Sequence, residues 1–175
     1  DLHLGETKVT GPGLVHLRRL TNLTHLNFLY NDLDDAELVH LRDLRNLTSL
    51  SLHWTDVSDE GLVNLVGLAN LQDVGLNGTR VTSEGLAHLK GLTHMRELGL
   101  RKTRISDAGL LHLAGMEALA DLDLAENELS DAGAAHLKGL SQLTVLYLSQ
   151  THLGDAGLTH LAGLSNLTVL HIGET

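Results

Sequence analysis

The chain has 175 residues, of which 42% are hydrophobic and only 2% aromatic, and its formal net charge is −10. It contains no cysteine, which excludes disulfides and thiolate metal sites and favours a reducing compartment such as the cytoplasm, or a bacterial source, secreted bacterial proteins included. Such an acidic chain does not suit a nucleic-acid backbone, and no run of about 18 apolar residues is present to span a membrane. We predict no nucleic-acid and no membrane partner, and the cellular location stays open.

A 24-residue period organises the whole sequence, with units that begin at residues 1, 25, 49, 73, 97, 121 and 145. A period of this length is the sequence signature of a solenoid. We therefore predict a single domain over 1–175. It consists of seven repeats, 1–24, 25–48, 49–72, 73–96, 97–120, 121–144 and 145–168, and a partial repeat at 169–175.

Each unit opens with an alternating apolar segment, such as Glu97-Leu98-Gly99-Leu100-Arg101. The two leucines of this segment face one way and the other residues face the opposite way, which predicts a short strand. A few residues later every unit has Thr or Asn, and these residues predict a polar ladder just inside a turn: Thr7, Asn31, Thr55, Thr79, Thr103, Asn127, Thr151 and Thr175.

The segment after the turn predicts a short helix, for which 106–115 is the example. Ser106 is a good N-cap, and Asp107 places negative charge at the positive end of the helix dipole. Leu110, Leu113 and Met116 recur every three residues and therefore share one face. Gly115 suits a left-handed helix end. Equivalent leucines stack into an unbroken column: Leu17, Leu41, Leu65, Leu89, Leu113, Leu137 and Leu161.

The unit LTSLSLHWTDVSDEGLVNLVGLAN resembles a leucine-rich repeat, and its length and its DEGL or DAGL helix start are similar to bacterial repeats of the GALA type. The resemblance covers the whole chain. It implies an α/β fold, a right-handed horseshoe-shaped solenoid with a parallel sheet on the concave face and short α-helices on the convex face. The turns depart from the family in favouring Thr over Asn, and should therefore have fewer side-chain donors. Arg19 and Asp43 also stand where later units have glycine.

The outward strand positions vary from unit to unit, whereas the core columns hardly change. Three of the four aromatic residues, Tyr30, Trp54 and Tyr147, lie in these variable positions. Trp and Tyr are enriched at binding hot spots. We predict that the concave strand face binds another protein, and the acidic charge suggests a basic one. The predicted contact residues are Leu29, Tyr30, His53, Trp54, Asp73, Asn77, Glu97, Arg101, Lys102, Asp121, Asp123 and Tyr147. A merely solvated face, on which the rings lie by chance, is the alternative.

Six histidines occupy one helix position, which invites a metal interpretation. Equivalent positions of stacked repeats point the same way at a spacing of about 8–10 Å, whereas zinc needs converging ligands at about 2 Å. We therefore predict structural histidines, no metal and no cofactor. The sequence has no nucleophile elbow, no phosphate-binding loop and no cysteine nucleophile, so we predict that the protein is not an enzyme.

Two other functions stay open. The chain begins and ends at a predicted strand, and its terminal apolar residues predict end-to-end self-association, as in a structural spacer or assembly module: Leu2, Leu4, Leu164, Leu170 and Ile172. The GALA resemblance also implies a substrate-recognition arm of a larger bacterial effector or enzyme, since such repeats can accompany an F-box.

Overall fold

The computed structural model describes residues 1–9 and 11–175. Within them, eight parallel strands form a sheet in chain order. The strands are β1 (Leu2–His3), β2 (His25–Asn27), β3 (Ser49–Ser51), β4 (Asp73–Gly75), β5 (Glu97–Gly99), β6 (Asp121–Asp123), β7 (Val145–Tyr147) and β8 (Val169–His171). Leu50 pairs with Val74, and Val74 pairs with Leu98, so the pairing register equals the sequence period.

Short helical segments connect successive strands. They are α1 (Gly11–Leu14), η1 (Val15–Arg19), η2 (Glu37–Leu41), α2 (Asp59–Leu62), η3 (Val63–Leu65), α3 (Leu86–Leu89), η4 (Asp107–Leu113), α4 (Asp131–Ala134), η5 (Ala135–Gly139) and α5 (Asp155–Leu161). The segments named η are 3-10 helices, and η4 replaces the α-helix predicted after Ser106. The spacing of Leu110 and Leu113 suits a 3-10 helix, which has three residues per turn, but the same spacing of Leu158 and Leu161 occurs in the α-helix α5.

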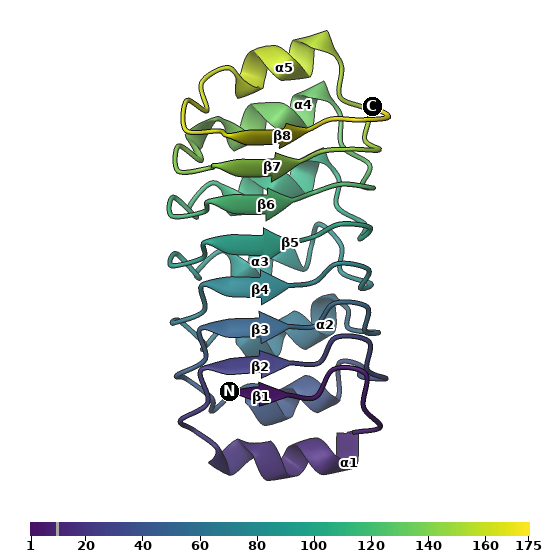
Figure 1. Ribbon diagram of the computed structural model, residues 1–175, viewed down its shortest axis with the longest axis vertical. Helices are drawn as coiled ribbons and strands as arrows, with labels where there is room; N and C mark the ends of the chain where they lie inside the picture. The colour runs from purple at the N-terminus through teal and green to yellow at the C-terminus, as the bar shows by residue number, and fades with distance from the viewer. Residues whose placement is uncertain (10) are drawn as a thin grey trace.

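The strands and the helices lie on opposite sides of the molecule (Figure 1). In that view α1 and α5 lie beyond the two ends of the strand stack, so the helix side follows the longer arc and the strand side is concave (Figure 1). The predicted α/β leucine-rich repeat solenoid is therefore confirmed. No helix in the described part of the chain is both long enough and apolar enough to cross a membrane.

Leucine columns fill the space between the sheet and the helices. Leu65, Leu89 and Leu113 have no exposed surface. In the same column Leu17 is 8% exposed and Leu161 is 5% exposed. Leu17 lies in the first unit and Leu161 in the last complete unit, so a complete unit covers each of them on one side only. Burial of this kind contributes roughly 1.5–3 kcal/mol per side chain.

The turn ladder is present, and Thr and Asn act differently in it. The Thr79 hydroxyl donates to the Leu76 carbonyl of its own unit at 2.7 Å. The Asn127 amide donates to the Leu124 carbonyl at 3.1 Å and also to the Leu100 carbonyl of the preceding unit at 2.7 Å. Asn127 therefore joins two units, whereas the Thr79 hydroxyl bonds only within its own unit, and the Thr103 hydroxyl reaches the next unit only by donating to Asn127 Oδ1 at 2.9 Å.

An aspartate on the helix side supplies a further connection between units. The two carboxylate oxygens of Asp59 accept hydrogen bonds from the backbone amide of Thr82 at 2.7 Å and from its hydroxyl at 2.6 Å. Gly85 leaves room for this carboxylate, because a Cβ atom there would overlap with Asp59 Oδ1. The same arrangement, which we call the Asp–Gly seam, recurs as Asp35 with Ser58 and Gly61, Asp107 with Ser130 and Gly133, and Asp131 with Gly154 and Gly157.

Two local predictions about the helices are wrong. The Ser106 side chain does not cap its helix; its hydroxyl lies 3.0 Å from the hydroxyl of Ser83, which replaces the seam aspartate in the fourth unit. Gly115 does not have a positive φ. The left-handed residue of each unit lies instead just after the strand. The first-turn aspartates thus serve the neighbouring unit and not only their own helix dipole.

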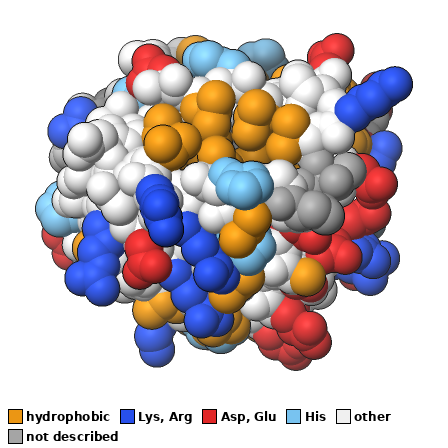
Figure 2. Space-filling view, turned by 90° about the horizontal axis from the view of Figure 1, so that it is seen from below, with side chains coloured by type: hydrophobic (Ala, Val, Ile, Leu, Met, Phe, Trp, Pro, Cys, Tyr) orange, Lys and Arg blue, Asp and Glu red, His pale blue; other side chains and the backbone are white. Residues whose placement is uncertain are grey.

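Figure 2 looks onto the end of the solenoid where the chain starts, and hydrophobic side chains gather in a patch there. At this end Val15 and Leu20 are 42% and 47% exposed, and Leu2 and Leu4 are partly buried against the core. End-to-end self-association stays a prediction.

Candidate partner-binding surface

The strand face presents four positions of every unit. We number positions from the first residue of a unit, so that Asp73 is position 1 of the fourth unit. Side chains at positions 2 and 4, such as Leu98 and Leu100, point into the core. Positions 1 and 3 alternate with them and point outward, and positions 5 and 6 follow the strand. All twelve predicted contact residues occupy positions 1, 3, 5 or 6.

Position 6 has a left-handed backbone in every complete unit, because the chain turns away from the sheet there. The non-glycine residues with this conformation have φ between 53° and 60°: Glu6, Tyr30, Trp54, Lys102, Glu126, Gln150 and Glu174. Such a φ is uncommon for non-glycine residues. Only the fourth unit has glycine, Gly78 with φ 70°. The Trp54 indole occupies the place where a Cβ atom of Gly78 would lie, so this glycine provides a seat for the ring.

The exposed rings of Tyr30 and Trp54 stack on each other along this edge. Their centroids are 6.0 Å apart and their planes differ by 11°. Tyr30 is 55% exposed and Trp54 36% exposed. On the other side of Gly78, the Lys102 ammonium lies 5.7 Å from the Trp54 ring centroid, within the range of a cation–π contact. We call Tyr30, Trp54 and Lys102 the aromatic edge. The sequence placed Tyr30 and Trp54 in adjacent units and Lys102 two units beyond Trp54, and the structure brings the Lys102 ammonium near the Trp54 ring.

Carboxylates form a row on neighbouring strands. The register places Asp73 beside Glu97 and Glu97 beside Asp121, and we call these three residues the acidic row. Partial burial and the charges of Asp73 and Asp121 raise the pKa of Glu97. Burial and the charge of Asp73 raise the pKa of Asp121. The row thus holds negative charges closer together than they would be in the unfolded chain, and a cation brought to it would be stabilised.

Asp123 and His53 lie next to this row. Burial raises the pKa of Asp123. Burial lowers the pKa of His53, although the Asp73 carboxylate opposes this shift. His53 Nδ1 accepts a hydrogen bond from the Asn77 backbone amide at 3.0 Å, and the imidazole lies over Gly75, where a Cβ atom would overlap with it. His53 is therefore neutral and half-buried, and its imidazole lines the strand face.

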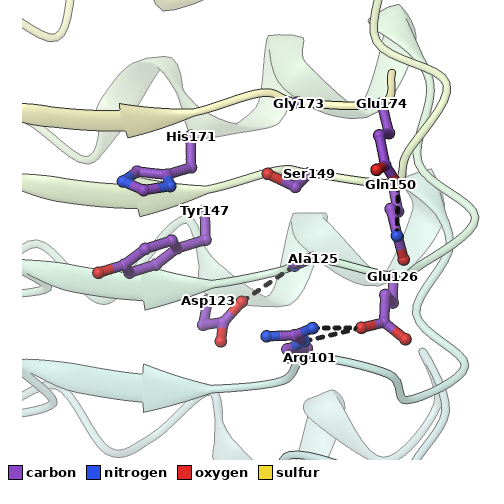
Figure 3. A pocket seen from close by; sticks show the side chains of 10 residues that line it. All are labelled: Arg101, Asp123, Ala125, Glu126, Tyr147, Ser149, Gln150, His171, Gly173 and Glu174. Atoms are coloured by element: carbon purple, nitrogen blue, oxygen red, sulfur yellow. Dashed lines mark hydrogen bonds and ion pairs between the residues drawn. The ribbon is translucent and has the colours of Figure 1, made fainter.

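Two hollows of this face lie over small residues. The smaller has a volume of about 190 Å³ and lies over Gly75 and Gly99. The larger, of about 560 Å³, lies over Ala125, Ser149 and Gly173 (Figure 3). In Figure 3 Tyr147 and His171 stand on one side of these small residues, and Glu126, Gln150 and Glu174 stand on the other. The rings of Tyr147 and His171 are 4.9 Å apart at their centroids.

The predicted contact residues thus fall into separate groups. Tyr147 belongs to the larger hollow, away from the aromatic edge. Arg101 and Lys102 are not isolated cations: Arg101 Nη2 lies 2.6 Å from Glu126 Oε1, and Lys102 Nζ lies 3.9 Å from Glu126 Oε2. Sequence reasoning missed the small residues that shape the face, Gly75, Gly78, Gly99, Ala125, Ser149 and Gly173. The signal that could have found them is their occurrence at positions 3, 5 and 6, which vary from unit to unit.

Among the residues that the structure describes, no three His, Cys, Asp or Glu side chains group in a way that could hold a metal ion. The surface offers aromatic, carboxylate and amide groups for contact.

Comparison with known proteins agrees with the fold. The leucine-rich repeat family matches residues 93–153 and residues 43–66. No curated protein matches the chain. Among solved structures, the chain is similar to an internalin (inlF) from Listeria monocytogenes, with 23% identity, a TM-score of 0.73 and coverage of 97% of this chain and 52% of the other. The chain therefore spans about half the length of that internalin.

Two further structures are similar over nearly the whole chain. Internalin C2 from Listeria monocytogenes has 26% identity and a TM-score of 0.75, with coverage of 98% of this chain and 79% of the other. The leucine-rich repeat ectodomain of the receptor kinase GASSHO1/SCHENGEN3 from Arabidopsis thaliana, solved in complex with CASPARIAN STRIP INTEGRITY FACTOR 2, has 24% identity and a TM-score of 0.69, with coverage of 98% and 21%. The chain is a leucine-rich repeat protein. The GALA type stays a prediction.

Proposed function

We propose that this protein binds another protein through its strand face and that the aromatic edge anchors the partner. Leucine-rich repeat solenoids are protein-interaction scaffolds, which use extended concave surfaces for binding. The observation that carries the proposal is the stack of Tyr30 and Trp54, 6.0 Å apart and exposed at the surface of a chain in which only 2% of residues are aromatic.

The rings are ordered before a partner arrives. Trp54 is held by Tyr30 on one face, by its seat over Gly78 and by the nearby Lys102 ammonium. A partner that covers the ring therefore loses little side-chain freedom, and loss of that freedom costs about 0.5–1.5 kcal/mol for a mobile side chain. Buried Trp and Tyr side chains dominate binding energy at interfaces.

The acidic row supports a basic partner. Asp73, Glu97 and Asp121 point to the same face as the hollows, and charges of one sign on a surface speed the approach of an oppositely charged protein. The ectodomain of GASSHO1/SCHENGEN3 was solved in complex with CASPARIAN STRIP INTEGRITY FACTOR 2, so another chain with this fold carries a partner.

Site-specific photo-crosslinking tests the proposal. A photoreactive amino acid replaces Leu29, which lies beside the aromatic edge, or Leu111, which is 56% exposed on the helix side. In extract of the source cells, we expect partner proteins to crosslink at position 29 and not at position 111.

Trp54→Ala should then weaken binding of the crosslinked partner by on the order of 2 kcal/mol, mainly through faster dissociation. Asp121→Asn should instead slow association and reduce its salt dependence. His112→Ala, on the helix side, is the control and should leave affinity unchanged. Equal crosslinking at both positions, or a loss of affinity with His112→Ala and not with Trp54→Ala, would overturn the assignment of the strand face.

A further inference from the structure

The two hollows of the strand face are sections of one groove. Asp123 and Tyr147 line both of them. In the fourth and fifth units the floor lies at position 3, where the residues are Gly75 and Gly99. In the last three units the floor lies at position 5, where the residues are Ala125, Ser149 and Gly173. The groove therefore crosses the sheet diagonally between the fifth and sixth units.

The dimensions of the groove suit an extended polypeptide. From Gly75 to Gly173 it crosses four strand spacings of about 4.8 Å and shifts by two residues, or about 6.6 Å, along the strand direction. The resulting length is about 20 Å. A strand rises about 3.3 Å per residue, so about six extended residues would fill the groove, whereas a helix about 10 Å wide would not enter hollows of 190 and 560 Å³.

Backbone donors line the floor of the larger hollow. In four units the position-5 amide donates to a side chain of the strand face: Leu29 to Asn27, Asn77 to His53, Arg101 to Asn77, and Ala125 to Asp123. In the described part of the chain, the position-5 amides of Gly5, His53, Ser149 and Gly173 have no hydrogen-bond acceptor, and those of Ser149 and Gly173 belong to the larger hollow. For Ser149 the cause is plain, because Ala125 and Tyr147 stand where its neighbours have Asn, Asp or His. These two amides can donate to the carbonyl groups of a bound chain.

The walls of the groove are acidic. The carboxylates that line the two hollows are Asp73, Glu97, Asp121, Asp123, Glu126 and Glu174. The only Lys or Arg in the same lining is Arg101, which is paired with Glu126. An extended chain presents alternate side chains to one side at intervals of about 6.6 Å, so cationic residues at alternate positions would meet this wall.

We propose that the groove binds an extended segment of about six residues that carries Lys or Arg at alternate positions and directs carbonyl groups to the amides of Ser149 and Gly173. The inference rests on the proposed protein-binding function and specifies the chemistry of the partner. The segment is a basic stretch of another protein, and the aromatic edge lies outside the groove as a separate contact.

Two defined peptides test the groove directly. An acetylated, amidated hexapeptide of alternating Lys and Ala is compared with one of alternating Glu and Ala, each fluorescently labelled, by anisotropy at low salt. We expect the Lys peptide to bind at least about tenfold more tightly than the Glu peptide, and its affinity to fall as salt is added. The same affinity for both peptides would overturn the proposal.

Two matched variants locate the bound peptide. Ala125 is 5% exposed and forms the floor, so Ala125→Leu should fill the groove and weaken binding of the Lys peptide by at least about tenfold. Ala156→Leu makes the same change at an exposed position of α5 on the helix side and should leave binding unchanged. Circular dichroism confirms that both variants are folded. Undiminished binding by a folded Ala125→Leu variant would contradict the groove.

Amide NMR of the unaltered protein keeps the test independent of any variant. Titration with the Lys peptide should shift the amide signals of Ser149 and Gly173 and leave that of His112 in place. Failure of the peptide and NMR tests, with partner crosslinking still dependent on Trp54, would overturn the groove and leave the proposed function standing. Loss of that dependence, with the peptide still bound in the groove, would overturn the aromatic anchor and leave the groove standing.

Discussion

The Asp–Gly seam between units and the open strand face differ in how much their residues vary from repeat to repeat. The seam repeats almost the same residues, as in Asp59 with Gly85 and Asp107 with Gly133. The strand face varies along the chain, from Ser51 through Gly99 to Tyr147 at position 3. At positions that contact the next unit the residue type hardly varies, because each unit packs against an equivalent neighbour. Positions that meet only solvent within the chain are free to serve recognition.

Even glycine has different functions in the two regions. At Gly85 the missing side chain admits a carboxylate whose two oxygens are both hydrogen-bonded to Thr82. At Gly75 it admits the outer part of the His53 ring. The seam glycine closes a contact between units, whereas the glycine of the strand face opens a hollow.

The largest expected effect is on the core that the units share. Leu113→Ala should cost about 2–5 kcal/mol of unfolding free energy, because Leu113 is fully buried between neighbouring units and the loss extends to both of them. Leu111 lies in the same helix η4 and is 56% exposed, so Leu111→Ala is the matched control, with a change within about 0.5 kcal/mol. Chemical denaturation measures both. Equal losses would contradict the stacked array.

A seam glycine should be less tolerant than a helix-end glycine. Gly85→Ala places a methyl group against Asp59 and should destabilise the protein by about 1–3 kcal/mol. Gly91 has no atom within 4 Å of an added Cβ, so Gly91→Ala should be neutral or stabilise by up to about 1 kcal/mol. Thermal denaturation measures both variants. If helix propensity alone determined the residue at these sites, alanine would stabilise the protein at both, and a stabilising Gly85→Ala would therefore contradict the seam.

The seam aspartates should differ along the chain. Asp107→Ala leaves the Ser130 amide and hydroxyl without their acceptor and should cost about 1–2 kcal/mol. Asp155 occupies the same position in the seventh unit and accepts no hydrogen bond within the described residues, so Asp155→Ala should change stability by less than about 0.5 kcal/mol. Urea unfolding compares the two. Equal losses would mean that the helix dipole, present at both sites, is the main role of these residues.

The smallest expected effect is a gain of stability on the strand face. The raised pKa values of Glu97 and Asp121, caused by burial and by neighbouring carboxylates, mean that the folded state binds protons more tightly than the unfolded state. Their contribution to stability is therefore present below the ordinary carboxyl pKa of about 4 and is lost as the pH rises through the raised values.

Asp121→Asn should accordingly stabilise the protein by a few tenths of a kcal/mol at neutral pH, and the gain should shrink as the pH falls towards about 4. Denaturation midpoints across this pH range measure it. A variant less stable than the parent at neutral pH would show that Asp121 supports the fold and is not a residue kept for binding at a small cost in stability.

The sequence by itself determined the parallel sheet, the leucine columns, the Thr and Asn ladder and the outward positions that a partner can reach. These follow from periodicity, because an apolar residue that recurs at a constant interval must stack on its equivalents. It misjudged Ser106 and Gly115, for which rules drawn from isolated helices do not include the neighbouring unit.

Only the tertiary structure decided what depends on contacts between units. The carboxylate of Asp59 reaches Thr82, Trp54 rests over Gly78, and two hollows join at Asp123 and Tyr147. Each of these contacts joins residues that lie one unit apart and occupy different positions or differ in type. Periodicity places equivalent residues side by side but does not say how unlike side chains meet, since that depends on backbone angles, on the space that a glycine leaves and on the direction in which each side chain turns.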